Sequence, residues 1–219
     1  MLIEDQKKIF EKLHNVSRET MQKLEEYRRM IICTQKKYNL IGKSTLDKIW
    51  IRHFADSAKI FPFVLKYHST LQQKPKICDV GSGAGFPGII ISVLFQEYKI
   101  KNNLSLIDSN EKKCLFLRSV RDKLGLNFEI INQRAEKLNV KYQIIMSRAL
   151  APLKSLFPIL KNINDKNTFI ILHKGENWER ELKEIKNKWK FKFNVVKNSK
   201  LIDNSGGITI IISNLQKKL

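Results

Sequence analysis

The fold is decided by residues 79–88, which read Asp79-Val80-Gly81-Ser82-Gly83-Ala84-Gly85-Phe86-Pro87-Gly88. A short apolar run at 77–80 leads into them and predicts a buried strand. The three alternating glycines allow a sharp turn and the close approach of a ligand, because glycine has no Cβ. Pro87 suits the first turn of a following helix. The segment therefore predicts a strand, a ligand-binding turn and a helix.

Further runs rich in β-branched residues recur along the chain, at 103–107, 127–131, 142–146 and 168–172. Most are separated by segments of helix length, which is typical of a mostly parallel sheet with helices on its faces. The last two runs, 191–196 and 208–212, leave no room for a crossover helix between them. We therefore expect an α/β, Rossmann-like fold with an antiparallel C-terminal hairpin at or near the sheet edge.

The first 70 residues predict helices. Apolar side chains recur at helical spacing over 4–16, and Ser17 is suited to cap a second helix. Ser44 and Asp47 match a capping box that would open a third helix, which we expect to run until Pro62 disturbs it. This part of the chain should form a helical extension.

We expect the whole chain to form one compact unit that consists of two parts. The sequence has no linker rich in Pro, Gly or Ser and no internal repeat, and its 42% hydrophobic content is enough for a packed core. We predict an N-terminal helical extension over 1–70, packed on a Rossmann-like core over 71–219. The oligomeric state expected for such a unit is a monomer.

The charge balance points to a polyanionic partner. Lys and Arg number 41 against 21 Asp and Glu, which leaves a net charge of +20 and a pI near 9.9. Such a surface attracts nucleic acid. The charge is spread over the chain, however, and a lysine-rich composition also occurs in proteins from AT-rich genomes. Charge alone therefore favours RNA binding without locating it.

The sequence indicates a protein of the cytoplasm. No run approaches the roughly 18 consecutive apolar residues of a membrane span, and the first residues lack the apolar core of a signal peptide. Cys33, Cys78 and Cys114 are odd in number and form no CxxC pair, so we expect reduced thiols. His53 and Asp56 share a helical spacing, but no further ligand lies near them, and we expect no metal site.

Two nucleoside cofactors compete for the glycine-rich segment. Residues 83–88 match the G-x-G-x-x-G pattern of dinucleotide sites, and Asp108 lies twenty residues later at the end of the next strand. Asp108 is suited to accept hydrogen bonds from ribose hydroxyls of either cofactor. Asp79, placed at the mouth of the turn, would repel a pyrophosphate but attract the sulfonium and ammonium of S-adenosylmethionine. We therefore favour S-adenosylmethionine and keep an NAD-dependent oxidoreductase as the alternative.

Beyond residues 79–88, six further matches in order extend a resemblance over about residues 36–176: Asn39-Leu40-Ile41, Trp50-Ile51-Arg52-His53-Phe54-Ala55-Asp56-Ser57, Ile107-Asp108-Ser109 with Lys112-Lys113 and Phe116-Leu117, Arg134-Ala135-Glu136, Ser147-Arg148-Ala149 and Lys174-Gly175. Together they resemble the glucose-inhibited division protein B family, the bacterial 16S ribosomal RNA guanine-N7 methyltransferases. The resemblance implies a class I S-adenosylmethionine-dependent methyltransferase. Its partner would be ribosomal RNA or the small ribosomal subunit, and its second product S-adenosylhomocysteine.

The resemblance also assigns residues to the site. It implies that Gly81 and Phe86 line the cofactor, that Ala135 and Glu136 meet its adenosine portion, and that Arg148 closes the site. With the residues argued from chemistry, the expected cofactor set is Asp79, Gly81, Gly83, Gly85, Phe86, Asp108, Ala135, Glu136 and Arg148. The resemblance places the RNA-binding candidates around the cofactor mouth, and these are Arg52, His53, Arg134 and Lys174.

The residues after the fourth expected strand narrow the reaction. Methylation of an exocyclic amine usually uses Asn or Asp followed by Pro-Pro and an aromatic residue, whereas this chain reads Ser147-Arg148-Ala149-Leu150. Carbon-5 methylation of cytosine needs a cysteine nucleophile, and neither Cys78 nor Cys114 is placed for it. Attack by a ring nitrogen such as guanine N7 needs no general base, because the lone pair is free. Arg148 could donate to a guanine carbonyl, contact a phosphate or hold the cofactor, and the sequence does not choose among these three roles. A non-catalytic RNA-binding module is the second alternative.

Overall fold

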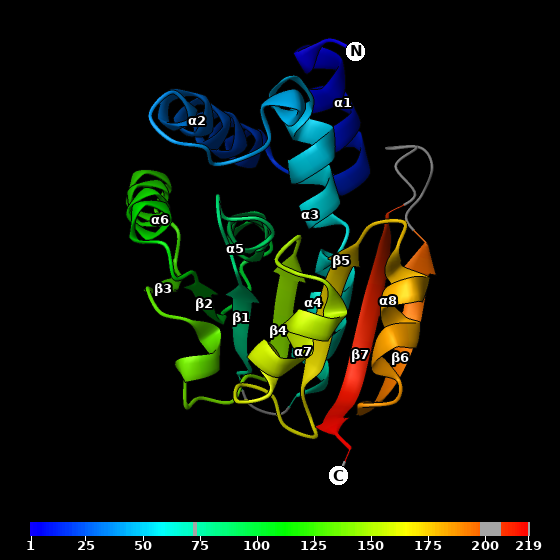
Figure 1. The fold of residues 1–219 in the computed structure, drawn as a ribbon. Helices are drawn as coiled ribbons and strands as arrows, with labels where there is room; N and C mark the ends of the chain where they lie inside the picture. Colours follow the sequence, from blue (N-terminus) through cyan, green and yellow to red (C-terminus); the bar gives the residue numbers. More distant parts are fainter. Residues whose placement is uncertain (72–73, 198–206, 219) are drawn as a thin grey trace.

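The computed structural model describes residues 1–71, 74–197 and 207–218. Its strands form one seven-stranded sheet in the order β3-β2-β1-β4-β5-β7-β6 (Figure 1). The strands are β1 (Lys76–Val80), β2 (Asn103–Ile107), β3 (Glu129–Ile131), β4 (Ile144–Arg148), β5 (Phe169–Lys174), β6 (Trp189–Lys197) and β7 (Ile208–Lys217). All seven predicted runs are therefore confirmed as strands, with ends that differ by a few residues.

The direction of the strands also follows the prediction. The neighbouring pairs among β1 to β5 are parallel, whereas β7 runs antiparallel to both β5 and β6. The last two strands form the expected antiparallel pair, with β6 at the sheet edge. Because β1, β2 and β4 are parallel neighbours, their carboxyl ends lie together, and a ligand site in such a sheet is expected there.

Helices cover both faces of the sheet, as the alternating pattern predicts. They are α5 (Gly88–Glu97), α6 (Glu111–Leu124), α7 (Leu153–Leu160) and α8 (Trp178–Ile185). Side chains of α5 and α6 share one hydrophobic cluster with the N-terminal helices, and those of α7 and α8 belong to a second cluster with β6 and β7. Within the described ranges, no helix is both long and apolar enough to cross a membrane.

The N-terminal extension begins with α1 (Ile3–His14) and α2 (Arg18–Gln35), which lie at the end of the sheet where the parallel strands finish (Figure 1). Ser17 caps α2 as predicted, since its side chain accepts a hydrogen bond from the Thr20 amide at 3.2 Å. A carboxylate of α5 joins this cap to the core, because Glu97 accepts from both the amide and the hydroxyl of Ser17. The cap therefore also fixes α2 against α5.

The predicted third helix is wrong in its form. The chain instead makes a 3₁₀-helix η1 (Lys43–Lys48), a π-helix η2 (Trp50–Ala55) and a short α3 (Asp56–Ala58). Ser44 caps nothing, because the residue before η1 is Gly42 and makes no side-chain cap. Pro62 lies in the first turn of α4 (Phe61–Thr70) rather than ending a helix, since a missing N–H costs nothing in a first turn.

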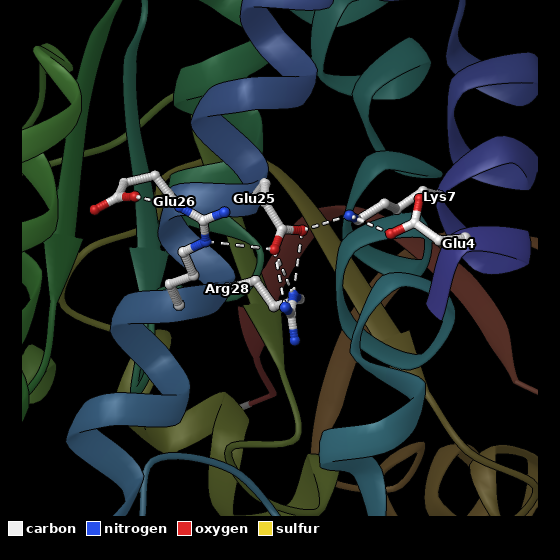
Figure 2. A network of polar contacts seen from close by, with 6 residues as sticks. Glu4, Lys7, Glu25, Glu26 and Arg28 are labelled. Carbon is white, nitrogen blue, oxygen red and sulfur yellow. Dashed lines mark hydrogen bonds and ion pairs between the residues drawn. The ribbon is translucent and has the colours of Figure 1, made fainter. Parts of the chain in front are cut away.

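An ion-pair network holds α1 against α2 (Figure 2). The carboxylate of Glu25 in α2 forms ion pairs with Lys7 of α1 at 3.1 Å and with Arg28 at 2.8 Å. Lys7 also pairs with the carboxylate of Glu4 at 2.8 Å. Partial burial raises the pKa of Glu25, but the hydrogen bonds from Arg28 and Lys7 outweigh it and leave that pKa below its ordinary value. The ionised carboxylate is therefore stabilised at this contact.

Candidate functional site

The turn after β1, residues 81–87, is called the glycine loop below. Gly81, Gly83 and Gly85 all have positive φ angles, of 72°, 58° and 100°. Residues with a Cβ rarely adopt this left-handed conformation, so the alternating glycines are required by the path of the chain. The amides of Gly81 and Ser82 donate to the Ile107 carbonyl at 2.9 and 3.1 Å, which fixes the loop to the end of β2.

A cavity of about 360 Å³ opens beside the glycine loop, at the carboxyl ends of β1, β2 and β4. This volume lies in the range of small-molecule sites. Its lining residues are Val80, Gly81, Ile107, Asp108, Ser109, Asn110, Lys113, Gln133, Arg134, Ala135, Glu136, Ala149, Leu150 and Ile159. Five residues predicted for the site, Gly81, Asp108, Arg134, Ala135 and Glu136, are therefore brought together around one cavity.

Asp108 organises one wall of this cavity. One of its carboxylate oxygens accepts from the Gly83 amide at 2.8 Å, and the other accepts from the Asn110 amide at 2.8 Å. The side chain of Asn110 in turn caps α6 by accepting from the Lys113 amide at 3.1 Å. The carboxylate is thus held in one orientation while it lines the cavity, and each oxygen keeps a lone pair for a ligand hydroxyl.

Asp79 lies beneath the glycine loop and is fully buried. Its Oδ2 accepts from the Gly88 amide at 2.9 Å, but Oδ1 has no hydrogen-bond partner among the described residues. Burial raises the pKa of Asp79 to about 7. The prediction that this side chain sits at the mouth of the loop is therefore wrong in position: the loop covers it, and it is absent from the cavity lining.

Arg148, at the end of β4, points away from the cavity toward the π-helix. Its guanidinium donates to the Arg52 carbonyl at 2.6 Å, the His53 carbonyl at 3.3 Å and the Ser57 hydroxyl at 3.4 Å. It also lies 5.7 Å from the centre of the Phe86 ring. Arg148 therefore ties η2 to the sheet and to the glycine loop, which the sequence alone could not distinguish from a contact with substrate.

His53 is buried between Arg148 and η1. Arg148 donates to Nδ1 at 3.1 Å, so Nε2 carries the proton and donates to the Thr45 hydroxyl at 2.8 Å, which donates to the Gly42 carbonyl at 2.7 Å. Burial, together with the nearby charges of Arg148 and Arg52, lowers the pKa of His53 to about 3. The imidazole is therefore neutral, and both of its nitrogens are engaged inside the protein.

Phe86 leaves the glycine loop on the side opposite the cavity lining. Its ring packs 4.9 Å from His53, 5.5 Å from Tyr27 and 5.9 Å from Phe54. The rings of Tyr27, Phe54 and Phe86 belong to the hydrophobic cluster shared with the N-terminal helices. Phe86 is not among the residues that line the cavity, and its contact with a cofactor stays a prediction. Phe86 anchors the loop in the N-terminal extension.

Comparison with known proteins decides the family. A model of the GidB family, described as rRNA small subunit methyltransferase G, matches residues 20–206. The ribosomal RNA small subunit methyltransferase G of Bartonella henselae is 36% identical over 199 residues, which are 90% of this chain and 88% of the relative. That of Rickettsia felis is 32% identical over 202 residues, covering 92% and 97%. The chain belongs to this family.

Solved structures agree on the fold of this small-subunit rRNA methyltransferase. A magnesium protoporphyrin IX methyltransferase from Synechocystis, with bound S-adenosylmethionine, has a TM-score of 0.59 at 11% identity and covers 86% of this chain and 97% of its own. A tRNA (m1A58) methyltransferase from Aquifex aeolicus has a TM-score of 0.53 at 15% identity, covering 74% and 68%. The fold is that of the S-adenosylmethionine-dependent methyltransferases, and the oxidoreductase and non-catalytic alternatives are set aside.

The four RNA candidates of this methyltransferase differ in accessibility. Arg134 lines the cavity and its side chain is 67% exposed, while Arg52 is half-buried. His53 is buried as described, and Lys174 pairs with Glu181 at 2.7 Å and donates to the Ala151 carbonyl at 3.1 Å. Arg134 is thus the candidate best placed to reach a substrate, whereas the side chains of His53 and Lys174 hold the protein together.

Nine of the fourteen cavity residues of the methyltransferase were not singled out from the sequence as site residues, and Asn110, Lys113 and Leu150 are three of them. Asn110 and Lys113 enter through the first turn of α6, and Leu150 follows β4. Their position gave the available signal, since each comes shortly after a parallel strand, where side chains gather at the ligand-binding edge. Lys113 also stands in the first turn of a helix, where the dipole disfavours a positive charge.

Proposed function

We propose that this protein transfers a methyl group from S-adenosylmethionine to N7 of a guanine in 16S ribosomal RNA. The observation that carries the proposal is Asp79, a buried carboxylate with one unpartnered oxygen directly under the glycine loop. An unpartnered carboxylate in such a place is costly unless a donor or a cation completes it. Although the loop separates Asp79 from the cavity, the field of its ionised carboxylate would attract the ammonium and sulfonium of S-adenosylmethionine and repel the pyrophosphate of a dinucleotide.

The residues of the loop and cavity fit this cofactor. A Cβ on Gly81 would stand 2.5 Å from Leu150, so the space between them is open only because residue 81 is glycine. Asp108 would hold the ribose hydroxyls, and Ala135 and Glu136 the adenosine portion. Gly83 and Gly85 shape the loop, and Arg148 supports it from outside. When bound, S-adenosylmethionine supplies a methyl group on a sulfonium, a good leaving group.

The chain's own residues favour a reaction without a general base. His53, the histidine nearest to the loop, is neutral with a pKa of about 3, and neither of its nitrogens is free to take a proton. Guanine N7 has a lone pair that carries no proton, so this nucleophile needs none removed. Catalysis would then come from alignment of the two reactants and from the field of the site.

RNA would approach over the cavity mouth. Arg134 is exposed there, and Arg52 is a half-buried residue of the π-helix that Arg148 holds. The net charge of +20 attracts the phosphate backbone from any direction, while these arginines would fix the nucleotide that enters the cavity. We assign His53 and Lys174 an indirect part, through the positions of η2 and of the loop after β4.

Transfer of labelled methyl tests this function. Purified protein is incubated with labelled S-adenosylmethionine and either naked 16S ribosomal RNA or small subunits from cells that lack the corresponding methyltransferase, and the RNA is digested to nucleosides. We expect the label in 7-methylguanosine, with the two substrates distinguishing free RNA from an assembled particle. Label in an exocyclic amine or in a pyrimidine would contradict the N7 assignment.

A further inference from the structure

Tyr27, in the middle of α2, reaches the glycine loop from outside the sheet. Its side chain is fully buried, and its hydroxyl donates to the carbonyl oxygen of Ala84. The ring stacks on Phe54 with 5.4 Å between centres and an angle of 4° between planes, and lies 5.5 Å from Phe86. Two residues of the loop, Ala84 and Phe86, therefore contact one tyrosine of the N-terminal extension.

The loop fits against Tyr27 without spare room. A Cβ on Gly85 would stand 2.9 Å from the Tyr27 hydroxyl oxygen and 2.3 Å from Ile89, and Gly85 has a φ of 100°. Both the space and the backbone conformation at residue 85 thus exclude a side chain. The position of the Tyr27 hydroxyl consequently limits the path that the chain can take between Ala84 and α5.

The first half of the loop is held by other partners. The amides of Gly81 and Ser82 bind the end of β2, and the Gly83 amide binds Asp108 just beyond it. These bonds fix the first half of the loop through amide donors. Tyr27 fixes the second half through a carbonyl acceptor, and without the hydroxyl the Ala84 carbonyl would lose this buried donor.

We propose that Tyr27 is a positioning residue for cofactor binding, so that α2 is part of the cofactor site. The inference rests on the proposed role of the glycine loop. Tyr27 touches neither the cavity nor its lining; it acts by holding the Ala84–Phe86 half of the loop in the shape that receives the cofactor. The N-terminal extension therefore contributes to cofactor binding as well as to RNA binding, because its Tyr27 holds a loop that belongs to the α/β core.

The test compares Tyr27→Phe with Tyr142→Phe, a matched loss of one buried hydroxyl. Tyr142 is 3% exposed and lies in the second hydrophobic cluster, which contains no residue of the glycine loop. Binding of S-adenosylhomocysteine is measured by calorimetry, and thermal unfolding is followed without ligand. We expect the dissociation constant to rise about three- to tenfold in Tyr27→Phe, the effect of one hydrogen bond, and to stay within about twofold in Tyr142→Phe.

Steady-state kinetics gives a second readout that a structural role would not produce. The KM for S-adenosylmethionine should rise in Tyr27→Phe by the same factor, while kcat at saturating cofactor stays within about twofold of the parent. An unchanged dissociation constant in Tyr27→Phe, or an equal loss of affinity in both variants, would overturn the positioning role. Failure of the parent protein to bind S-adenosylhomocysteine would instead overturn the proposed function, and this role with it.

Discussion

Asp79 under the glycine loop and Glu25 between α1 and α2 are both drawn out of water, but their surroundings differ. Lys7 and Arg28 meet the carboxylate of Glu25, and its pKa lies below the ordinary value. Asp79 has one amide donor, from Gly88, and an unpartnered oxygen, and burial raises its pKa to about 7. The carboxylate of Glu25 is therefore fully paired, whereas one oxygen of Asp79 has no partner within the part of the chain that the structure describes.

The same contrast appears in the backbone. α1 and α2 are regular helices, and a left-handed residue, Asn15 with φ of 44°, ends α1, whereas four residues at the site have positive φ angles. They occur at three glycines of the loop and at Ala149, a non-glycine residue with φ of 53° directly after Arg148. Glycine adopts this conformation without strain, but at Ala149 it costs free energy and persists because the surrounding structure enforces it. We therefore expect substitutions in the loop region to change mainly the affinity for the cofactor. Substitutions at the contact between α1 and α2 should change mainly the free energy of unfolding.

The largest effect is expected from Gly81→Val. The new side chain would collide with Leu150, which lies 2.5 Å from the place that a Cβ would take, and would be forced into a φ of 72°. We expect the affinity for S-adenosylmethionine to fall at least about a hundredfold, or about 2.8 kcal/mol, as measured by calorimetry. Circular dichroism should show that the domain stays folded.

Gly125→Val is the matched control for backbone strain. Gly125 also has a positive φ, of 61°, but it ends α6 and has no atom within 4 Å of an added Cβ. Both substitutions should cost about 1–2 kcal/mol of stability through the left-handed conformation. Only Gly81→Val should affect the cofactor, and an unchanged dissociation constant there would remove the loop from the cofactor site.

Asp79→Asn should have opposite effects on stability and on binding. The raised pKa, about 7 against an ordinary 3.8, means that the folded protein keeps this proton in a range where the unfolded chain has lost it. Its contribution to stability is therefore present below about pH 4 and is lost as the pH rises through 7. The parent should lose up to about 4 kcal/mol over this window from Asp79, at 1.36 kcal/mol for each pKa unit. Cofactor-free Asp79→Asn should consequently melt above the parent at pH 8.

The binding half of this prediction uses two ligands. If Asp79 feels the sulfonium, Asp79→Asn should weaken S-adenosylmethionine more than the neutral-sulfur product S-adenosylhomocysteine, and the parent should bind S-adenosylmethionine more weakly as the pH falls below 7. Calorimetric titrations of both ligands at pH 6 and 8 measure this. Equal weakening of the two would mean that Asp79 acts through the shared ammonium or through the Gly88 amide.

His53→Gln should reduce activity by about three- to tenfold, because one or more hydrogen bonds to Arg148 and Thr45 are lost. Its pKa of about 3 places its titration well below the assay range. Single-turnover rates of both proteins should therefore be flat between about pH 6 and 9, without the rising acid limb of a general base. A limb that is present in the parent and vanishes in His53→Gln would refute the base-free mechanism.

The strands along the chain and the place of the ligand-binding turn could be predicted because both depend on the pattern of neighbouring residues. Residues 77–80 are continuously apolar apart from Asp79, the glycines follow at once, and helix-length segments separate most of the next strands. Asp108 could be placed for the same reason, since it follows a parallel strand and such strands end at one edge, whereas Ala135 and Glu136 were placed by the family resemblance. Ser17 was recognisable as a cap from its neighbours alone.

The direction of several side chains could not be predicted, because it depends on partners far away in the sequence. Arg148 turns toward the carbonyl of Arg52, 96 residues earlier, and so leaves the cavity that its position after β4 suggests. Lys174 is held by Glu181 across a turn, and the depth of Asp79 depends on how the loop folds over it. The π-helix has no signature in hydrophobic spacing, which explains why a regular helix was expected there.

The smallest effect is expected at the helix contact, from Glu25→Gln. The pKa of Glu25 is lowered in the folded protein, so its contribution to stability is present above the unfolded value near 4.5 and is lost as the pH falls through the lower folded value. Because the side chain is 17% exposed and its partners are partly solvated, we expect a loss of about 1 kcal/mol or less at pH 7, reduced by salt.

Glu26→Gln, which removes a 3.8 Å pair with Arg29 on the same helix, is the control and should change almost nothing. Urea unfolding at pH 7 and pH 3.5 measures both, and cofactor affinity should be the same in each variant as in the parent. A Glu25→Gln protein that binds S-adenosylhomocysteine more weakly would show that the α1–α2 contact also shapes the loop, and the separation between the two regions would then be lost.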